Sequence, residues 1–194
     1  MIWGYAVYDW TGRGRDTLVT NEGNMEVEKA IKTAIDYEMK VRDVYASAVA
    51  NSKNETAKRV FKQLAKEEQG HIDYLESRLT EWKRTGKLKT KTLETTIPTK
   101  GAIEDGVKKL ESKMKEADKF GEAQMLTKAL DVEIETSKFY EQMVDQLEAE
   151  PQRMFKRFLE IEEGHLAIVQ AELDSLNGTG FWFDFREFNL ESEG

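Results

Sequence analysis

Apolar and polar residues alternate along this chain in a pattern that predicts four long amphipathic helices. Through most of residues 24–177, apolar positions recur every three or four residues, the spacing that lines one face of an α-helix. Asn24 and Asn54 are suited to cap helix starts, and Gly86 is suited to end a helix. Pro151 either breaks a helix or opens the next one. The predicted helices span residues 24–51, 54–84, 120–149 and 151–176.

The remaining segments are expected to form connections and terminal extensions. Residues 87–100, rich in Lys and Thr, predict a long connection between two helix pairs, and residues 101–118 predict a lesser amphipathic helix. We expect an aromatic N-terminal arm over residues 1–23, a helical bundle over residues 24–177 and an aromatic C-terminal tail over residues 178–194. The sequence of the C-terminal tail predicts an extended segment or a short strand. We expect the two terminal extensions either to cap the bundle or to build a dimer interface.

Six ionisable residues fall on helix faces that should be core. Glu38 lies seven residues from both Ile31 and Tyr45, and Glu133 lies seven residues before Tyr140. The other two long helices each carry a Glu-x-x-His sequence, whose i, i+3 spacing puts both side chains on one face. The six residues are Glu38, Glu68, His71, Glu133, Glu162 and His165.

The two histidines belong to a sequence that occurs twice. They are the only histidines in the chain. Residues Phe61, Lys62, Glu68, Gly70 and His71 recur 94 positions later, and Ala34, Asp36, Glu38 and Tyr45 recur 95 positions later. Each half therefore carries one helix with Glu and Tyr seven apart and one helix with Glu-x-x-His, which indicates a duplicated helix pair.

Buried carboxylates at these positions predict bound metal. An unpaired carboxylate in a protein core costs several kcal/mol, and four close together repel one another. Two divalent cations would balance the four negative charges. Carboxylate oxygens with two imidazoles suit iron or manganese, with zinc as an alternative occupant. This ligand set matches that of di-metal carboxylate bundles, so we expect two iron ions, or manganese in their place.

Composition excludes several other classes of protein. The chain has 194 residues and a net charge of −8, which argues against nucleic-acid binding. It has no cysteine, so it forms neither a disulfide framework nor an iron–sulfur or rubredoxin-type site. No apolar run approaches the ~20 residues of a membrane span, and the N-terminus lacks signal-peptide features. We expect a cytoplasmic protein.

Other polar residues lie near these positions. Tyr45 and Tyr140 either act as catalytic residues, which hydrogen-bond a ligand or quench stray oxidant, or are ordinary core tyrosines with a bonded hydroxyl. Asp36 and its repeat Asp131 lie two residues from the expected ligands and are predicted to face solvent. Glu67 and Glu163 are also predicted to be exposed.

The chain resembles the ferritin-like superfamily and, within it, rubrerythrin-type proteins. The resemblance covers roughly residues 24–177 and is carried by Glu38 with Tyr45, by Glu133 and by the two Glu-x-x-His sequences. It implies an all-α ferritin-like four-helix bundle of two antiparallel helix pairs joined by a long crossover. It also implies a non-haem di-iron centre that reduces hydrogen peroxide to water.

Two departures from the rubrerythrin pattern matter. Rubrerythrins usually carry a rubredoxin domain with four cysteines, which is absent here, so the reductant would be a separate electron-donor protein or molecule. They also place an extra glutamate three residues after the third-helix ligand, where this chain has Thr136. Glu135 lies about 200° from Glu133 around the helix and is a poor substitute. These departures fit a simpler and more symmetric site.

Three functions remain open on this evidence. The chain is a di-iron peroxidase or oxidase acting on peroxide or oxygen, a ferroxidase that handles iron, or a non-enzymatic bundle stabilised by metal. The first predicts peroxide consumption, the second predicts turnover of many ferrous ions, and the third predicts metal that is inert to oxidants. As partners we expect the oxidant, a separate electron donor and a second copy of the chain in a homodimer.

Overall fold

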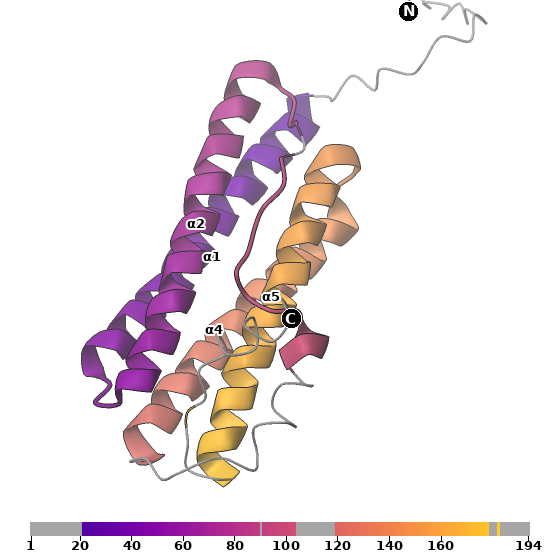
Figure 1. Ribbon diagram of the computed structural model, residues 1–194. Helices are drawn as coiled ribbons and strands as arrows, with labels where there is room; N and C mark the ends of the chain where they lie inside the picture. Colours follow the sequence, from indigo (N-terminus) through magenta and orange to yellow (C-terminus); the bar gives the residue numbers. More distant parts are fainter. Residues whose placement is uncertain (1–20, 90, 104–118, 179–181, 183–194) are drawn as a thin grey trace, which may run out of the picture.

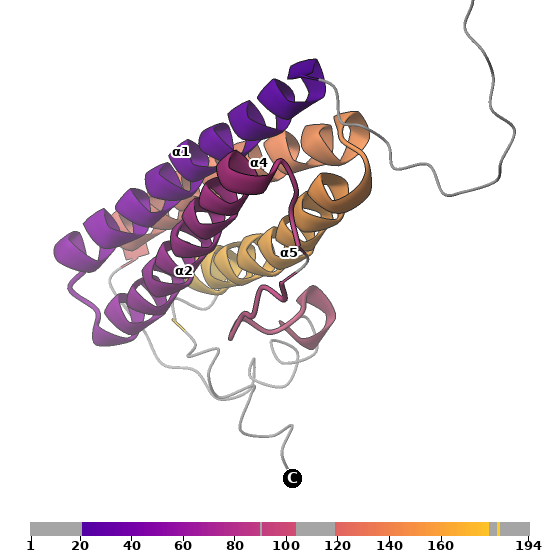
Figure 2. The same cartoon turned by 90° about the horizontal axis from the view of Figure 1, so that it is seen from above.

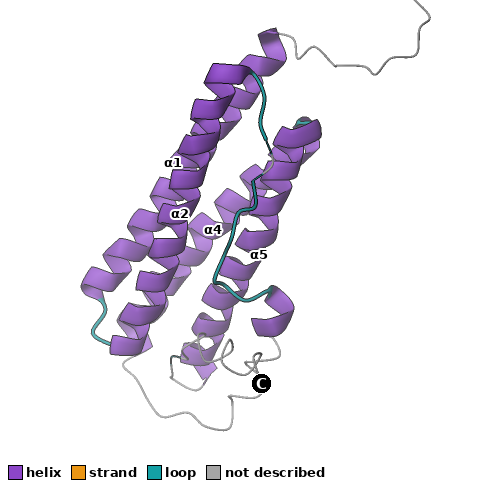
Figure 3. Ribbon diagram, turned by 45° about the horizontal axis from the view of Figure 1, so that its top comes forward, coloured by secondary structure: helices purple, strands orange, loops and turns teal. Residues whose placement is uncertain are grey.

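Four long helices form the described part of the protein. The computed structural model describes residues 21–89, 91–103, 119–178 and 182. In chain order the helices are α1 (Asn21–Asn51), α2 (Glu55–Thr85), α4 (Lys119–Gln146) and α5 (Ala149–Gly178). Helices and loops account for all the described residues, as Figure 3 shows.

The helices are arranged as two pairs. Helix α1 packs along α2, α4 packs along α5, and α1 also contacts α4. Figure 1 shows the two pairs side by side, with the connection after α2 running along the bundle. Short turns within each pair make its two helices antiparallel. The expected all-α bundle of two antiparallel helix pairs is therefore confirmed.

Local signals explain three of the helix ends. The Asn54 side chain accepts hydrogen bonds from the backbone N–H groups of Thr56 and Ala57, which caps α2. Gly86 ends α2 with φ 63°, a left-handed conformation that glycine adopts without strain. Pro151 lies in the first turn of α5, where a missing N–H costs nothing, so it opens that helix rather than breaking α4.

Two helix ends differ from the sequence prediction by three residues, and the others by two or fewer. Helix α1 begins at Asn21 rather than after Asn24. Helix α4 ends at Gln146, three residues earlier than predicted, and the turn that follows places Ala149 at φ 54°. The apolar spacing typical of a helix continues across this tight turn, so the sequence pattern does not reveal where α4 ends.

Within the described residues, the apolar core consists of two clusters at opposite ends of the bundle. One surrounds Tyr45, Phe61 and Leu64, and the other surrounds Tyr140 and Phe158. Along every helix, the expected metal-ligating residues fall between the residues of one cluster and those of the other. The polar layer thus has apolar packing above and below, which keeps water out of the middle of the bundle.

The crossover segment after α2 runs over the groove between α2 and α5. Tyr74 of α2 donates a hydrogen bond to the Lys91 carbonyl at 2.9 Å, and the Arg157 guanidinium of α5 donates to the Leu93 carbonyl at 3.3 and 3.2 Å. Figure 2, the view from above, shows the segment on this side of the bundle. Residues 100–103 then begin a helix, and the rest of the expected helix at 101–118 lies outside the described residues.

Little of the terminal extensions falls within the described residues. The arm at residues 1–20 and most of the tail lie outside them. Trp182 is described: its indole N–H donates to the buried Glu122 carboxylate at 2.5 Å, and its ring meets Phe61 edge-on. This part of the tail packs on its own bundle. None of the described helices is long and apolar enough to cross a membrane.

Candidate metal centre

The structure brings the six predicted ligand residues together in the middle of the bundle. Helices α1 and α4 each supply one glutamate, and α2 and α5 each supply a Glu-x-x-His pair. All six side chains are at most 1% exposed. Helical spacing explains the arrangement locally, because residues three apart share a face that each helix turns inward. The six residues are Glu38, Glu68, His71, Glu133, Glu162 and His165.

These residues form two overlapping groups, each suited to hold one ion. In each group the candidate ligand atoms lie within 4.8 Å of one another. Glu68 and Glu162 belong to both groups. Glu38 and His71 complete the first, and Glu133 and His165 complete the second. Each position thus has three carboxylates and one imidazole, and the two shared carboxylates lie between the two positions.

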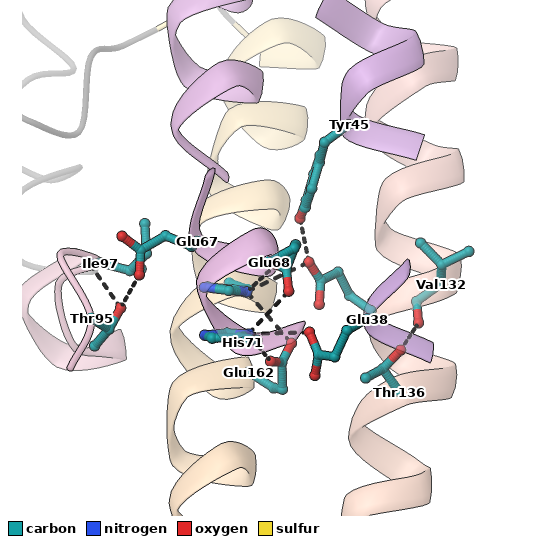
Figure 4. A network of polar contacts seen from close by, with 12 residues as sticks. Glu38, Tyr45, Glu67, Glu68, His71, Thr95, Ile97, Val132, Thr136 and Glu162 are labelled. Carbon is teal, nitrogen blue, oxygen red and sulfur yellow. Dashed lines mark hydrogen bonds and ion pairs between the residues drawn. The ribbon is translucent and has the colours of Figure 1, made fainter. Parts of the chain in front are cut away.

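The two imidazole rings face the carboxylates with the same edge. His71 Nδ1 lies 3.1 Å from oxygens of both Glu38 and Glu68, and His165 Nδ1 lies 2.8 Å from Glu68 Oε1. The rings are stacked, with centroids 5.4 Å apart and planes 9° apart. Figure 4 shows the Glu38 and Glu162 carboxylates on the same side of the His71 ring. The Nδ1 atoms are therefore the ring atoms available to a metal.

Without metal, burial and like charge make the site electrostatically costly. Burial raises the pKa of Glu38 well above its usual range, and the Glu162 carboxylate adds to this effect. The pKa of Glu133 is raised well above its usual range for the same reasons, with Glu68 contributing as well. Burial and the neighbouring carboxylates thus favour the protonated form of both carboxyls.

The same carboxylates favour the charged form of the two imidazoles. Burial alone would lower the pKa of His71, but Glu38 and Glu68 outweigh it and raise that pKa to about 10. Burial is likewise outweighed at His165, whose pKa is raised well above its usual range by Glu68 and Glu162. Burial would raise the pKa of Glu68, but the two histidines hold it well below its ordinary value. Protons thus supply the positive charge that the carboxylates need.

Several buried polar atoms of the site have no hydrogen-bond partner among the described residues. They are Glu68 Oε1, Glu133 Oε2, both oxygens of Glu162, Nε2 of His71 and both ring nitrogens of His165. Unpaired buried polar atoms are rare in proteins, because each costs about 1–3 kcal/mol. Most of these atoms face the shared centre of the two groups. The donor set therefore fits a pair of metal ions, which would satisfy the oxygens and the Nδ1 atoms together.

Two tyrosines hold carboxylates of the site from the opposite helix. The Tyr45 hydroxyl of α1 donates to Glu133 on α4, and the Tyr140 hydroxyl of α4 donates to Glu38 on α1. Burial raises the pKa of both tyrosines well above the usual range, and the facing carboxylate raises each further. The phenols therefore stay protonated and remain donors. Of the two roles open for them, contact with a ligand carboxylate is the one the geometry supports.

The third-helix position that departs from the rubrerythrin pattern carries no ligand. Thr136 is buried, and its hydroxyl donates to the Val132 carbonyl of its own helix at 2.9 Å (Figure 4). Glu135 lies on the exposed side of α4, where it pairs with Lys40 at 3.4 Å. Asp36 and Asp131 are exposed, as predicted. The two halves of the site are therefore alike in their ligands.

One acidic residue lies where the sequence did not place it. Glu163 is exposed as predicted, but Glu67 is half-buried beneath the crossover segment. Its carboxylate accepts hydrogen bonds from the Thr95 hydroxyl at 2.9 Å and the Thr96 hydroxyl at 2.5 Å. The expectation of exposure was wrong because helical phase alone does not reveal where a distant loop lies.

A bundle of two antiparallel helix pairs around a buried Glu/His cluster of this kind defines the ferritin-like di-metal class. Comparison with known families matches residues 29–173 to Rubrerythrin. The chain belongs to the rubrerythrin family. No curated protein matches the chain, and no solved structure matches it either.

Proposed function

We propose that the chain is a non-haem di-iron protein of rubrerythrin type that reduces hydrogen peroxide, or oxygen, to water. The observation that carries the proposal is the pair of overlapping groups, each with three carboxylates and one imidazole, in a fully buried layer. Glu38 with His71 would hold one ion and Glu133 with His165 the other. Glu68 and Glu162, which belong to both groups, would help to hold both ions.

Iron, or manganese in its place, suits this set of ligands. Carboxylate oxygens are hard ligands and imidazole is borderline, a combination typical of iron and manganese sites. Two ferrous ions, when bound, would supply the two electrons that convert hydrogen peroxide and two protons into two water molecules. The two apolar clusters on either side of the site would keep bulk water and other reductants away from the reacting oxidant.

Tyr45 and Tyr140 are the chain's own candidates for a supporting catalytic role. Each phenol holds a carboxylate that would be a terminal ligand and so keeps that ligand oriented. Each also places an oxidisable group beside the centre, where it would quench a stray oxidant. We therefore assign them positioning and protective roles in the proposed reaction.

The electrons must come from outside the chain. A di-iron centre that has reduced peroxide needs two electrons to act again, and this sequence has no cysteine with which to hold a redox iron site. We propose a separate electron donor. Nothing in the described part of the chain provides a second redox centre.

Metal content, spectrum and peroxide consumption together test the proposal. Protein from iron-replete cells is analysed for iron per chain, and the anaerobically reduced protein is then mixed with peroxide. We expect about two irons per chain, an oxo-bridge absorption band after peroxide, and peroxide loss faster than with the same concentration of free Fe²⁺. The Glu163→Ala variant, altered on the exposed face, is the matched control for the Glu162→Ala ligand variant.

Other outcomes would favour the alternatives. Oxidation of many ferrous ions per chain by a large assembly in light scattering would indicate iron handling instead. Tightly bound metal that raises the melting temperature but does not react with peroxide would indicate a structural role. No bound metal after anaerobic reconstitution would overturn the proposed function.

A further inference from the structure

Glu67 lies behind the two histidines, on the side away from the metal positions. A carboxylate oxygen of Glu67 and one ring nitrogen from each of His71 and His165 all lie within 4.8 Å of one another. Figure 4 shows Glu67 across the His71 ring from Glu38. The Nδ1 edge of each ring faces the carboxylates, so the Nε2 edge is the one that remains for Glu67.

Both Nε2 atoms need an acceptor. A neutral ring that binds a metal through Nδ1 carries its proton on Nε2. An Nε2–H donor is therefore present on each ring when the metals are bound. Both Nε2 atoms are buried and lack a hydrogen-bond partner among the described residues. Leaving such a donor unpaired is unfavourable, and a Glu67 oxygen lies within 4.8 Å of one ring nitrogen of each histidine.

The crossover segment holds the Glu67 carboxylate in this place. Thr95 and Thr96 donate hydroxyl hydrogen bonds to it at 2.9 and 2.5 Å, and the Thr96 backbone N–H lies 3.3 Å from both oxygens. Gln63, one turn earlier on α2, approaches at 3.4 Å. Thr95, Thr96 and Gln63 thus bring four donors to the two oxygens, about as many as a carboxylate has acceptor directions. The histidine Nε2–H groups would therefore share these oxygens, directly or through a bridging water, with the longer contacts from Gln63 and the Thr96 N–H.

This carboxylate has no counterpart in the other half of the site. The repeat offset of 94 that relates His71 to His165 relates Glu67 to Ile161, a buried apolar residue. One glutamate therefore serves both histidines of an otherwise duplicated centre. The stacking of the two rings, with centroids 5.4 Å apart, is what brings both Nε2 atoms within reach of a single side chain.

We propose that Glu67, clamped by Thr95 and Thr96, is a positioning residue that accepts the Nε2–H protons of both His71 and His165 and so directs both Nδ1 atoms to the metals. The inference rests on the proposed metal centre. It adds a role for the crossover segment, which would set the orientation of both imidazole ligands. Glu67 touches neither the substrate nor the metals and acts only through the histidines.

The presence of only two histidines allows a direct test. Protein labelled with ¹⁵N-histidine and loaded with diamagnetic zinc gives NMR signals from these two rings alone. In the unaltered protein we expect both rings to be protonated at Nε2, with N–H protons that exchange slowly with water. In Glu67→Leu these N–H signals should shift upfield and exchange faster, and zinc affinity should fall about 10–100-fold.

Two further variants make the result specific. Glu67→Gln keeps the size and one acceptor oxygen, so it should fold if Glu67→Leu does not, and it should give an intermediate N–H shift. Glu163→Leu changes the exposed glutamate beside Glu162 and should leave both rings unchanged. An unaltered N–H spectrum and zinc affinity in both Glu67 variants would overturn the inference.

The inference and the proposed function fail in different ways. Zinc that does not bind to the unaltered protein would remove the metal centre and, with it, both proposals. If the protein binds two zinc ions and the N–H signals are the same in the Glu67 variants as in the unaltered protein, the inference alone is overturned. A third zinc ion, held by Glu67 and both Nε2 atoms, would abolish the N–H signals in the unaltered protein and also overturn it.

Discussion

The Tyr45 hydroxyl on α1 donates a hydrogen bond to the Glu133 carboxylate on α4, and not to Glu38 on its own helix. The reciprocal pair, Tyr140 on α4 with Glu38 on α1, completes a crossed arrangement. Each glutamate is thus held by a tyrosine from the helix that faces it. The two hydrogen bonds join α1 to α4 across the boundary between the two helix pairs.

Removal of one of these hydroxyls should weaken metal binding without unfolding the protein. In Tyr45→Phe the buried Glu133 carboxylate loses a donor, which costs about 1–3 kcal/mol of folding free energy. Metal affinity should fall about 10–100-fold, as for the loss of other groups that orient ligands. Metal titration and thermal unfolding measure both effects. Tyr37→Phe, at a tyrosine that stacks on Phe139 outside the site, should change neither quantity.

Loss of a predicted ligand should abolish the two-metal complement but leave a folded bundle. Glu162→Ala removes a carboxylate shared by both positions, and His165→Ala removes the imidazole of one. Since the metal-free site suffers from repulsion among buried carboxylates, Glu162→Ala relieves part of that cost. Elemental analysis and circular dichroism are the measurements. A full two-metal complement in either variant would show that the assignment of ligands is wrong.

Metal binding should release protons, and metal affinity should therefore rise with pH. The pKa values of Glu38 and Glu133 are raised by burial and then by neighbouring carboxylates, which favours the protonated form of both groups in the metal-free site. Against the effect of burial, Glu38 and Glu68 raise the pKa of His71 to about 10, so its Nδ1 proton must also leave. At a pH below the pKa of such a group, its proton competes with the metal and favours the metal-free form.

Calorimetric titration of zinc into the metal-free protein, in buffers of different ionisation enthalpy, measures this release. At pH 7 we expect more than one proton per chain, and we expect affinity to increase as pH rises towards 10. A heat of binding that is independent of the buffer would contradict the protonation states assigned to these carboxyls and imidazoles.

The two repeated glycines should respond differently to alanine. A Cβ added at Gly164 would lie 3.1 Å from the Pro98 carbonyl and 3.4 Å from an Ile97 side-chain atom, whereas one added at Gly70 meets nothing within 4 Å. Alanine in a helix is worth about 0.5–1 kcal/mol over glycine, so Gly70→Ala should stabilise the protein by roughly that amount.

At Gly164 the same gain is offset because the crossover backbone must move. We expect Gly164→Ala to be less stable than Gly70→Ala by about 1 kcal/mol or more, as measured by chemical denaturation. Equal stabilisation by the two substitutions would mean that the crossover segment does not lie tightly over α5 at this point.

Much of this protein could be predicted from local patterns. Apolar spacing indicated the four long helices, and Asn54 and Gly86 marked both ends of α2 correctly. The i, i+3 relation of Glu68 to His71 placed both on one inward face. Duplication of that relation at Glu162 and His165 predicted a second half of the same site. Such features depend only on helical geometry, which every residue shares with its near neighbours in sequence.

The partners of these residues across the bundle were decided only by the tertiary structure. Tyr45 is equally compatible in sequence with Glu38 and Glu133, and the packing of α1 on α4 selects Glu133. The path of the crossover segment buries Glu67 and closes the space over Gly164. The sequence by itself thus determined which faces turn inward, because helical periodicity is local. Which groups meet there depends on contacts between segments far apart in the chain, and no local pattern records them.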